Sequence, residues 1–301
     1  MLNMYPELTI TDAMLTASNV PEDDYPVYDP AAIYAASDQV IVIATHSVYQ
    51  SVSGGNSGND PTTDDGTNWI RIGPTNRWKA FDNTVLGGTE NAGTITYSIE
   101  PDVLVLAIYF VELSASKVRV QVFDPGDNEV WDRTVELVDY STMIDYAHVY
   151  WWNGGYQTKE LLTGIPGYVG NRIEITIGDG FGTAGVGQIV LASQVNIGIP
   201  ISGARVSLTD FSKKEQNEFG AFTITKRGYA REVQYPVLVA APEGERVLRE
   251  LERYLACPVV FAVSEGHTKY GTTIYGYVID PYITLETGSD SEMVIVVKGI
   301  V

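Results

Sequence analysis

The chain has 301 residues, of which 45% are hydrophobic and 19% are charged, and its 38 acidic against 19 basic side chains give a net charge of −19. This length and balance exclude a single short peptide module and a disordered chain, and the apolar runs are too short for a membrane span. The acidic charge argues against nucleic acid as a partner, because phosphate backbones are bound by clustered Lys and Arg.

Charge and connector residues divide the chain into three predicted domains. Residues 1–80 carry 10 acids and 3 bases, residues 81–200 carry 15 and 5, and residues 201–301 carry 13 and 11. This shift, with a connector at 199–203, predicts boundaries near 80 and 200. The start of the chain has no basic segment followed by an apolar run, so no signal peptide is expected. The single cysteine, Cys257, excludes a disulfide framework or a cysteine-ligated zinc within one chain.

Residues 1–80 predict a small β-module. Short strands are expected around 40–43 and 46–49, then a polar loop over 53–66, and then an alternating, half-buried strand at 69–72. Several aromatic residues crowd this module, and in a unit so small large rings are an effective way to exclude water. We expect Tyr34, Tyr49 and Trp69 to form its core, and Tyr28 is a candidate for contact with a carbohydrate or a partner.

Residues 81–200 predict a β-sandwich or jelly roll. About seven short strands separated by turns, such as 117–123 with its strict alternation, follow one another with no helical period. Trp151 and Trp152 are neighbours on one predicted strand and cannot both point inward, since successive side chains alternate faces. Trp151, Trp152 and Tyr156 are therefore candidate contact residues for a carbohydrate or an interface.

Two acidic loops gather oxygen atoms of the kind that calcium prefers. They are Asp124 to Glu129, a turn in which proline presets φ and Gly126 is expected to accept a positive φ, and the pairs at 59–60 and 64–65. Neither has EF-hand spacing. The sequence therefore predicts solvated acidic turns, with no metal and no other cofactor.

Residues 201–301 predict an α+β domain with one helix. Strands are expected at 204–208, 219–225 and 234–240, and again after the helix. Pro242 opens an amphipathic segment whose apolar stripe is typical of a helix that packs on a sheet: Val247, Leu248, Leu251, Tyr254 and Leu255.

Nothing in the sequence predicts an enzyme. The three histidines, His46, His148 and His267, stand outside any recognisable catalytic motif, and there is no Gly-x-Ser-x-Gly, Walker or His-Glu-x-x-His pattern. We interpret each as an ordinary polar residue. A pair of carboxylates that cleaves glycosides stays open as the least favoured alternative, because sequence does not show their separation.

Residues 28–73 resemble the small chitin-binding type of carbohydrate-binding module found in many chitinases. The matching residues are Tyr28-Asp29-Pro30, Tyr34, Ser37 to Val40, Tyr49, Asp60-Pro61, Trp69 and Gly73. Where those modules carry paired aromatic residues after the tyrosine of the second strand, this chain has Gln50 to Gly54. The resemblance implies a small β-fold and a module that binds glycans.

A longer resemblance covers residues 55–61 and 69–82. The second stretch reads Trp-x-x-x-Gly-Pro-Thr-Asn-Arg-Trp-x-x-Phe-Asp and resembles a segment of structural proteins in tailed-bacteriophage virions, where such a module precedes a β-sandwich. Gly73-Pro74 is expected to force a turn, with Arg77 and Asp82 paired across it. The expected stiff interdomain joint comprises Trp69, Pro74, Arg77, Trp78, Phe81 and Asp82.

The third domain is loosely similar to attachment domains of phage tail and baseplate proteins. Together these resemblances imply a non-enzymatic virion component of the tail tip, baseplate or an adaptor ring, assembled in the host cytoplasm. Its expected partners are other virion proteins, with the near-neutral residues 201–301 forming the contacts of a ring. The alternative is an adhesin that binds bacterial surface glycans through its first or its second domain.

Overall fold

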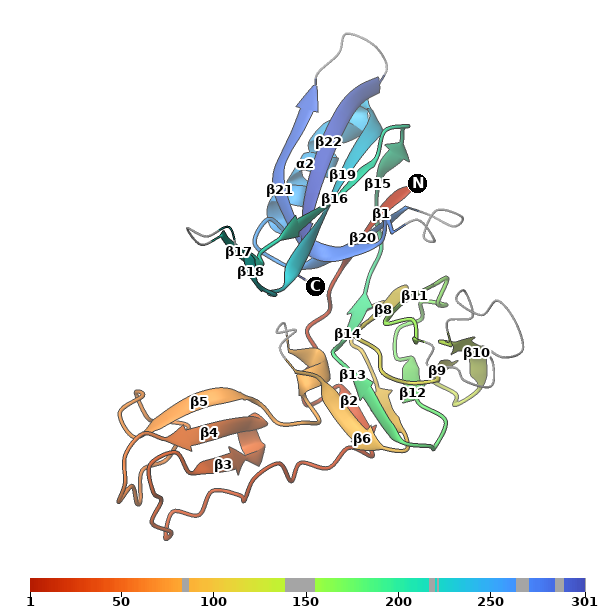
Figure 1. Cartoon of the computed structure of the whole chain (residues 1–301). Coiled ribbons are helices and arrows are strands. Elements are labelled where there is room, and N and C mark those ends of the chain that lie inside the picture. The colour runs from red at the N-terminus through yellow and green to blue at the C-terminus, as the bar shows by residue number, and fades with distance from the viewer. Residues whose placement is uncertain are drawn as a thin grey trace, which may run out of the picture. The chain divides into compact units, whose positions relative to one another are not determined.

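The computed structural model describes residues 1–82, 87–138, 155–216, 220, 222–263, 271–284 and 290–300. It confirms the expected class: the chain is mainly β, with several antiparallel sheets and, within these ranges, one α-helix near the C-terminus (Figure 1). The chain forms two compact units, one made of Thr9–Val190 and the other of Met1–Leu8 with Leu191–Val301. In the described ranges, no helix has the length and apolarity that crossing a membrane requires.

The small β-module is a three-stranded antiparallel sheet in the order β3-β4-β5. Its elements are β3 (Gln39–Val42), the 3₁₀ turn η1 (Ile43–Thr45), β4 (Ser47–Ser51) and β5 (Trp69–Pro74). The expected turn at Gly73-Pro74 is wrong, because both residues continue β5 and pair with β4. Since β5 is an edge strand, Pro74 at its last position removes no hydrogen bond from the interior of the sheet. The chain turns only afterwards, at 76–78.

The β-sandwich contains a five-stranded sheet in the order β10-β9-β12-β7-β2 and a three-stranded sheet in the order β11-β8-β14, with β6 paired to β13. Residues alternate between buried and accessible along β7, β9 and β12, as in a sheet packed on one face, whereas β8 and β14 are buried throughout. The strands are β2 (Leu15–Ser18), β6 (Thr89–Ala92), β7 (Ile95–Ile99), β8 (Ala107–Val111), β9 (Lys117–Phe123), β10 (Glu129–Glu136), β11 (Lys159–Thr163), β12 (Arg172–Ile177), β13 (Thr183–Val186) and β14 (Gln188–Ala192).

The C-terminal unit is a closed antiparallel barrel. Its strands follow the order β15-β1-β20-β21-β22-β19, and a further pairing of β19 with β15 closes the ring, while β16 extends from β19. A hairpin of β17 and β18 follows β16. The strands are β1 (Leu2–Pro6), β15 (Val195–Pro200), β16 (Arg205–Asp210), β17 (Lys213–Gln216), β18 (Phe222–Thr225), β19 (Tyr229–Ala240), β20 (Val259–Val263), β21 (Ile274–Thr284) and β22 (Asp290–Gly299).

The first strand of the chain belongs to this barrel and not to the small module. β1 pairs with β15 on one side and β20 on the other, and Leu2 and Met4 are fully buried in the barrel core. The domain predicted over 1–80 therefore lacks its first eight residues, and the last domain begins at 191 and not at 201. Five apolar-rich residues carry too little periodicity to show that their partners are β15 and β20, near the other end of the chain.

The predicted helix is confirmed as α2 (Gly244–Arg253), which follows the 3₁₀ turn η4 (Ala241–Glu243). Val247 and Leu251 are buried in the barrel core, and Leu248 and Tyr254 pack against that core. Leu255, the last residue of the predicted stripe, lies beyond the helix and is exposed.

The turn after β9 differs in one detail from expectation. The residue with a positive φ is Asp127, at 63°, and not Gly126. A Cβ at Gly126 would lie 3.0 Å from the Asn128 side chain and 3.1 Å from that of Asp124, so both side chains would have to shift by a few tenths of an ångström. Glycine at this position leaves room for these two polar side chains and does not supply a left-handed backbone.

Candidate functional site

The joint between the small module and the sandwich is a hydrogen-bonded segment over residues 75–81. The Thr75 backbone N–H donates to the His46 carbonyl at 2.9 Å, and the Trp78 backbone N–H donates to the Thr75 carbonyl at 2.9 Å. The 3₁₀ turn η2 (Lys79–Phe81) follows at once. Thr75 is fully buried. The segment therefore leaves the module as ordered structure and not as a flexible linker.

A row of contacting rings crosses the joint. The His46 and Trp78 rings stack with centroids 4.5 Å apart, Trp78 meets Phe81 edge-on at 6.0 Å, and Phe81 meets Tyr97 edge-on at 4.9 Å. His46 precedes β4 of the small module, and Tyr97 lies in β7 of the sandwich. Edge-to-face and offset-stacked rings at these distances are stabilising beyond the area that they bury. Trp78 and Phe81 thus connect the two sheets.

The Glu22 carboxylate is the polar centre of the joint. Its side chain is 5% exposed, accepts a hydrogen bond from the Trp78 indole N–H at 3.1 Å and forms an ion pair with Arg77, whose guanidinium lies 3.4 Å away. The Arg77 Nε also donates to the Val20 carbonyl at 2.7 Å. Arg77, which was expected to pair with Asp82, forms its ion pair with Glu22. A buried carboxylate needs such partners, because an unpaired charge is costly to bury.

His46 is held between two carboxylates. Its Nδ1 lies 3.0 Å from a Glu22 oxygen, and its Nε2 lies 3.1 Å from an Asp12 oxygen. Both ring nitrogens of His46 are therefore in contact with carboxylate oxygens, one from Glu22 and one from Asp12. The interpretation of His46 as an ordinary polar residue missed this role.

Backbone and amide groups fasten the joint to the sandwich. The Asn76 side chain donates to the Glu90 carbonyl at 2.7 Å and accepts from the Glu90 N–H at 3.0 Å. The Tyr97 hydroxyl donates to the Arg77 carbonyl at 2.7 Å, and burial raises the pKa of that hydroxyl. Asn76 and Arg77 of the joint are thus held by hydrogen bonds to Glu90 and Tyr97 of the sandwich.

The aromatic residues of the small module form its core. Trp69 is 2% exposed, and its ring centroid lies 5.1 Å from that of Tyr34 and 5.8 Å from that of Tyr28. The Trp69 indole N–H and the Tyr28 hydroxyl both donate to the Asn59 carbonyl, at 2.9 and 2.8 Å. Core packing of Trp69 and Tyr49 is confirmed, and Tyr34 packs against them. Tyr28, the candidate contact residue, lies partly buried against this cluster.

The polar loop of the small module is organised by its own carboxylates. Asp64 accepts hydrogen bonds from three backbone N–H groups, those of Gly66, Asn68 and Trp69, and from the Asn68 amide. These donors, the Trp69 N–H foremost, lower the pKa of Asp64 to about 2. The loop therefore positions Trp69 at the start of β5 through a single ionised side chain.

Replacing Asp64 by alanine is expected to lower the thermal midpoint of the small module, because three backbone donors lose their acceptor. The folded-state pKa of about 2 lies below the reference value of 3.8. The stabilisation is thus complete above pH 3.8 and is lost as pH falls toward 2. Thermal unfolding followed by tryptophan fluorescence should show that the midpoint of the wild type falls between pH 3.8 and about 2. The midpoint of Asp64→Ala should fall less over the same range. Equal pH dependence in both proteins would contradict the assignment, and Asp23→Ala, at an exposed carboxylate, is the control.

The acidic turn after β9 is organised in the same way. Asp124 accepts from the backbone N–H groups of Gly126 and Asn128, at 2.8 and 2.9 Å, and the Asn128 groups foremost lower its pKa. The Asp124 oxygens are therefore used in hydrogen bonds within the turn itself. Within the described ranges, no three His, Cys, Asp or Glu side chains gather as a metal site would require.

The remaining candidate contact residues come from the sandwich. Trp151 and Trp152 lie outside the described residues, as do His148 and His267. Tyr156 is 41% exposed and forms an isolated antiparallel bridge with Val138. Of the predicted joint residues, Arg77, Trp78 and Phe81 come together, while Trp69 lies in the module core and Pro74 ends β5. Asp82 follows η2 in an extended conformation.

Sequence reasoning missed Glu22 and Asp12 in the joint. Glu22 lies 24 residues from His46 and 56 from Trp78 along the chain. No motif spans such separations. The one available signal is the acidic run at 22–24, directly before the module. A carboxylate of this run that becomes buried needs a hydrogen-bond donor or a cation as a partner.

No protein-family model matches the chain, and no curated protein matches it. Among solved structures, a fucose-binding module from Streptococcus pneumoniae matches 39% of this chain and 84% of its own length, with 10% sequence identity and a TM-score of 0.27. A TM-score of this size does not establish a shared fold.

Proposed function

We propose that this chain is a non-enzymatic structural component of a tailed-phage virion, in the tail tip, the baseplate or an adaptor ring. The observation that carries the proposal is the joint. The stretch that resembles virion structural proteins, Trp69 to Asp82, is also the stretch whose rings and hydrogen bonds fasten the small module to the sandwich. A structural protein needs such a stiff connection, because the connection fixes the position of one binding surface relative to another.

The charge distribution supports assembly through the C-terminal unit. Residues 1–200 carry 25 acids against 8 bases, whereas residues 201–301 are close to neutral. Self-repulsion opposes close packing of the acidic parts of neighbouring subunits. In this proposal the barrel makes the contacts with other virion proteins, and the two acidic β-domains face outward.

Protein mass spectrometry of purified phage particles, together with a particle reconstruction by cryo-electron microscopy, tests this function. The expected result is that the chain is present in a fixed number of copies per particle and that its barrel lies at a symmetric interface. Absence of the chain from particles that are otherwise complete would end the proposal.

A second candidate function is a glycan-binding adhesin. Exposed aromatic side chains on the sandwich favour it, because flat exposed rings stack on sugars: Tyr156, Tyr168 and Phe181 are 41%, 57% and 85% exposed. A glycan array probed with residues 9–190 is the test. Binding that is lost on Tyr156→Ala, Trp151→Ala or Trp152→Ala would support the adhesin, and an array without signal would dismiss it.

A further inference from the structure

The C-terminal unit carries a three-stranded arm whose surface is unusually apolar for exposed structure. We define the basic arm as the described residues between 205 and 229, which comprise β16, β17 and β18 (Figure 1). Every residue in these three strands is exposed. Six large apolar side chains in the arm are each at least 42% exposed: Val206, Leu208, Phe211, Phe222, Ile224 and Tyr229.

The pairing of β17 with β18 places two of these apolar residues side by side. In β17 and β18, Ile224 lies opposite Lys214 and Phe222 lies opposite Gln216, so Phe222 and Ile224 share one face. Both are about two-thirds exposed, at 66% and 65%. An isolated two-stranded hairpin is at best marginally stable in water, so an arm of this kind gains stability when a partner covers it.

The arm is also the basic element of an acidic protein. Residues 205–229 contain five basic side chains against three acidic ones, while the whole chain has a net charge of −19. The basic residues include Lys213 and Lys214 in β17. A partner surface that carries an exposed carboxylate is therefore complementary to the arm.

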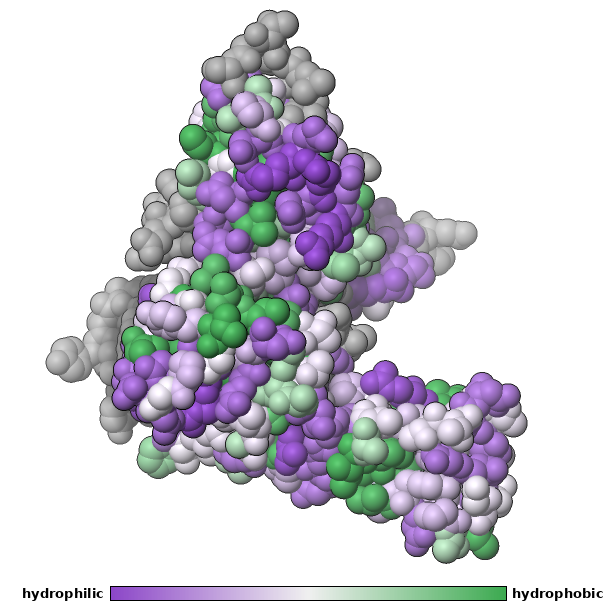
Figure 2. Space-filling model, turned by 180° about the vertical axis from the view of Figure 1, so that it is seen from behind, coloured by the Kyte–Doolittle hydropathy of each residue, from purple (hydrophilic) through white to green (hydrophobic). Residues whose placement is uncertain are grey.

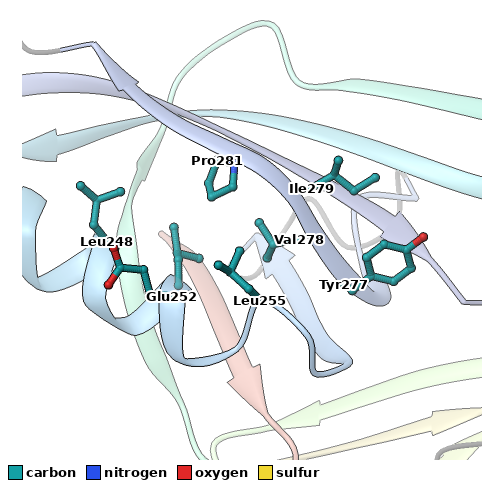
Figure 3. Close-up of a pocket in the computed structure, with 8 residues that line it drawn as sticks. Leu248, Glu252, Leu255, Tyr277, Val278, Ile279 and Pro281 are labelled. Carbon is teal, nitrogen blue, oxygen red and sulfur yellow. The ribbon is translucent and has the colours of Figure 1, made fainter.

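The same unit has an apolar groove between α2 and β21, with a volume of about 490 Å³. Figure 3 shows Leu248 and Glu252 on the helix side, and Val278, Ile279 and Pro281 along the strand. Leu255 and Tyr277 also line the groove and are 43% and 39% exposed, and the Glu252 residue is exposed. All the lining residues come from 248–255 and 277–281, so the arm does not fill its own groove.

We infer that the basic arm of one copy docks in the α2–β21 groove of a second copy. Phe222 and Ile224 supply apolar anchors for an apolar groove. Lys214, which lies opposite Ile224 and so on the same face, supplies a charge opposite to that of Glu252, and its ion pair with Asp210 is exposed and open to exchange. Apolar side chains elsewhere on the surface lie in separate patches on the face that Figure 2 shows. Because arm and groove are different surfaces, the contact is head-to-tail and generates a closed ring or a filament.

This inference deepens the proposed function, since it names the surfaces through which the C-terminal unit assembles. Native mass spectrometry and sedimentation velocity of the full chain test it. We expect concentration-dependent oligomers of the wild-type chain, and at least tenfold weaker association of an arm variant, Phe222→Asp, and of a groove variant, Leu255→Glu. Both substituted residues are exposed, so the fold is retained, which circular dichroism checks. Phe181→Asp, at an exposed site in the other unit, is the matched control and should associate as the wild type does.

Mixing the two variants gives the sharpest test. The arm variant keeps an intact groove and the groove variant keeps an intact arm, so an equimolar mixture should form a one-to-one dimer that cannot extend. A monomeric wild-type chain, an arm variant that still oligomerises, or a mixture that stays monomeric would each overturn the inference. If the chain is found in virions while any of these results holds, the arm inference fails and the proposed function stands.

Discussion

Replacing Trp78 by alanine is expected to lower the free energy of unfolding of residues 9–190 by about 3–5 kcal/mol, the usual cost of removing a large buried ring. Trp78 is 9% exposed, stacks on His46, contacts Phe81 and donates to the buried Glu22 carboxylate. Its removal leaves both a cavity and a carboxylate with one donor fewer. Urea denaturation followed by circular dichroism measures the change.

The same variant should also loosen the joint itself. Trypsin cleaves after Arg77 and Lys79, which lie in the ordered segment. We expect cleavage there to be slow in the wild type and at least tenfold faster in Trp78→Ala, because the open form becomes more populated. Phe181→Ala, at a side chain that is 85% exposed, is the matched control. Unfolding and cleavage of Trp78→Ala indistinguishable from those of this control would refute a joint held by Trp78.

A chain that consists of residues 191–301 alone is expected not to fold, whereas residues 1–8 joined by a short Gly/Ser linker to residues 191–301 should fold. Leu2 and Met4 are fully buried in the barrel core, and β1 fills the place between β15 and β20. Loss of each such side chain costs about 2–5 kcal/mol, and small domains are stable by only about 5–15 kcal/mol. The linker is short because the Leu8 N–H donates to the Leu191 carbonyl at 2.7 Å.

Circular dichroism and amide exchange by NMR distinguish these outcomes. The joined chain should show a cooperative thermal transition, and the chain without residues 1–8 should show none. Met4→Asp in the joined chain is the matched variant and is expected to behave like the deletion, because it buries a charge without a partner. A cooperative transition in residues 191–301 alone would mean that the boundary predicted near residue 200 describes the folding unit better.

Local patterns predicted much of the secondary structure. The alternation over 117–123 predicted a strand with Val118, Val120 and Val122 on one face, and these three are fully buried in β9. The stripe from Val247 to Leu251 predicted α2 and its buried face in the same way. Period-2 and period-3.6 patterns are local because they arise from the geometry of one element packed on one core.

The candidate site was predicted in part. The Trp-bracketed motif indicated a stiff joint, and the structure places Trp78 and Phe81 in its row of rings. The acidic partners were not predicted, since Asp12 and Glu22 reach His46 only after three separate segments have folded together. Contacts between residues far apart in sequence depend on the packing of elements, which no single-segment pattern records.

By itself, the sequence determined the mainly-β class, the amphipathic helix, the aromatic core of the small module and the uneven distribution of charge. Each of these follows from residue composition or from periodicity within one segment. Only the tertiary structure decided that the first strand closes a barrel with strands from the other end of the chain, that a buried carboxylate is the polar centre of the joint, and that, among the residues that the structure describes, a basic arm and an apolar groove are exposed on one unit. Burial is a property of the whole packed fold, so the pairing of distant strands and the exposure of a given face become known only when every element is in place.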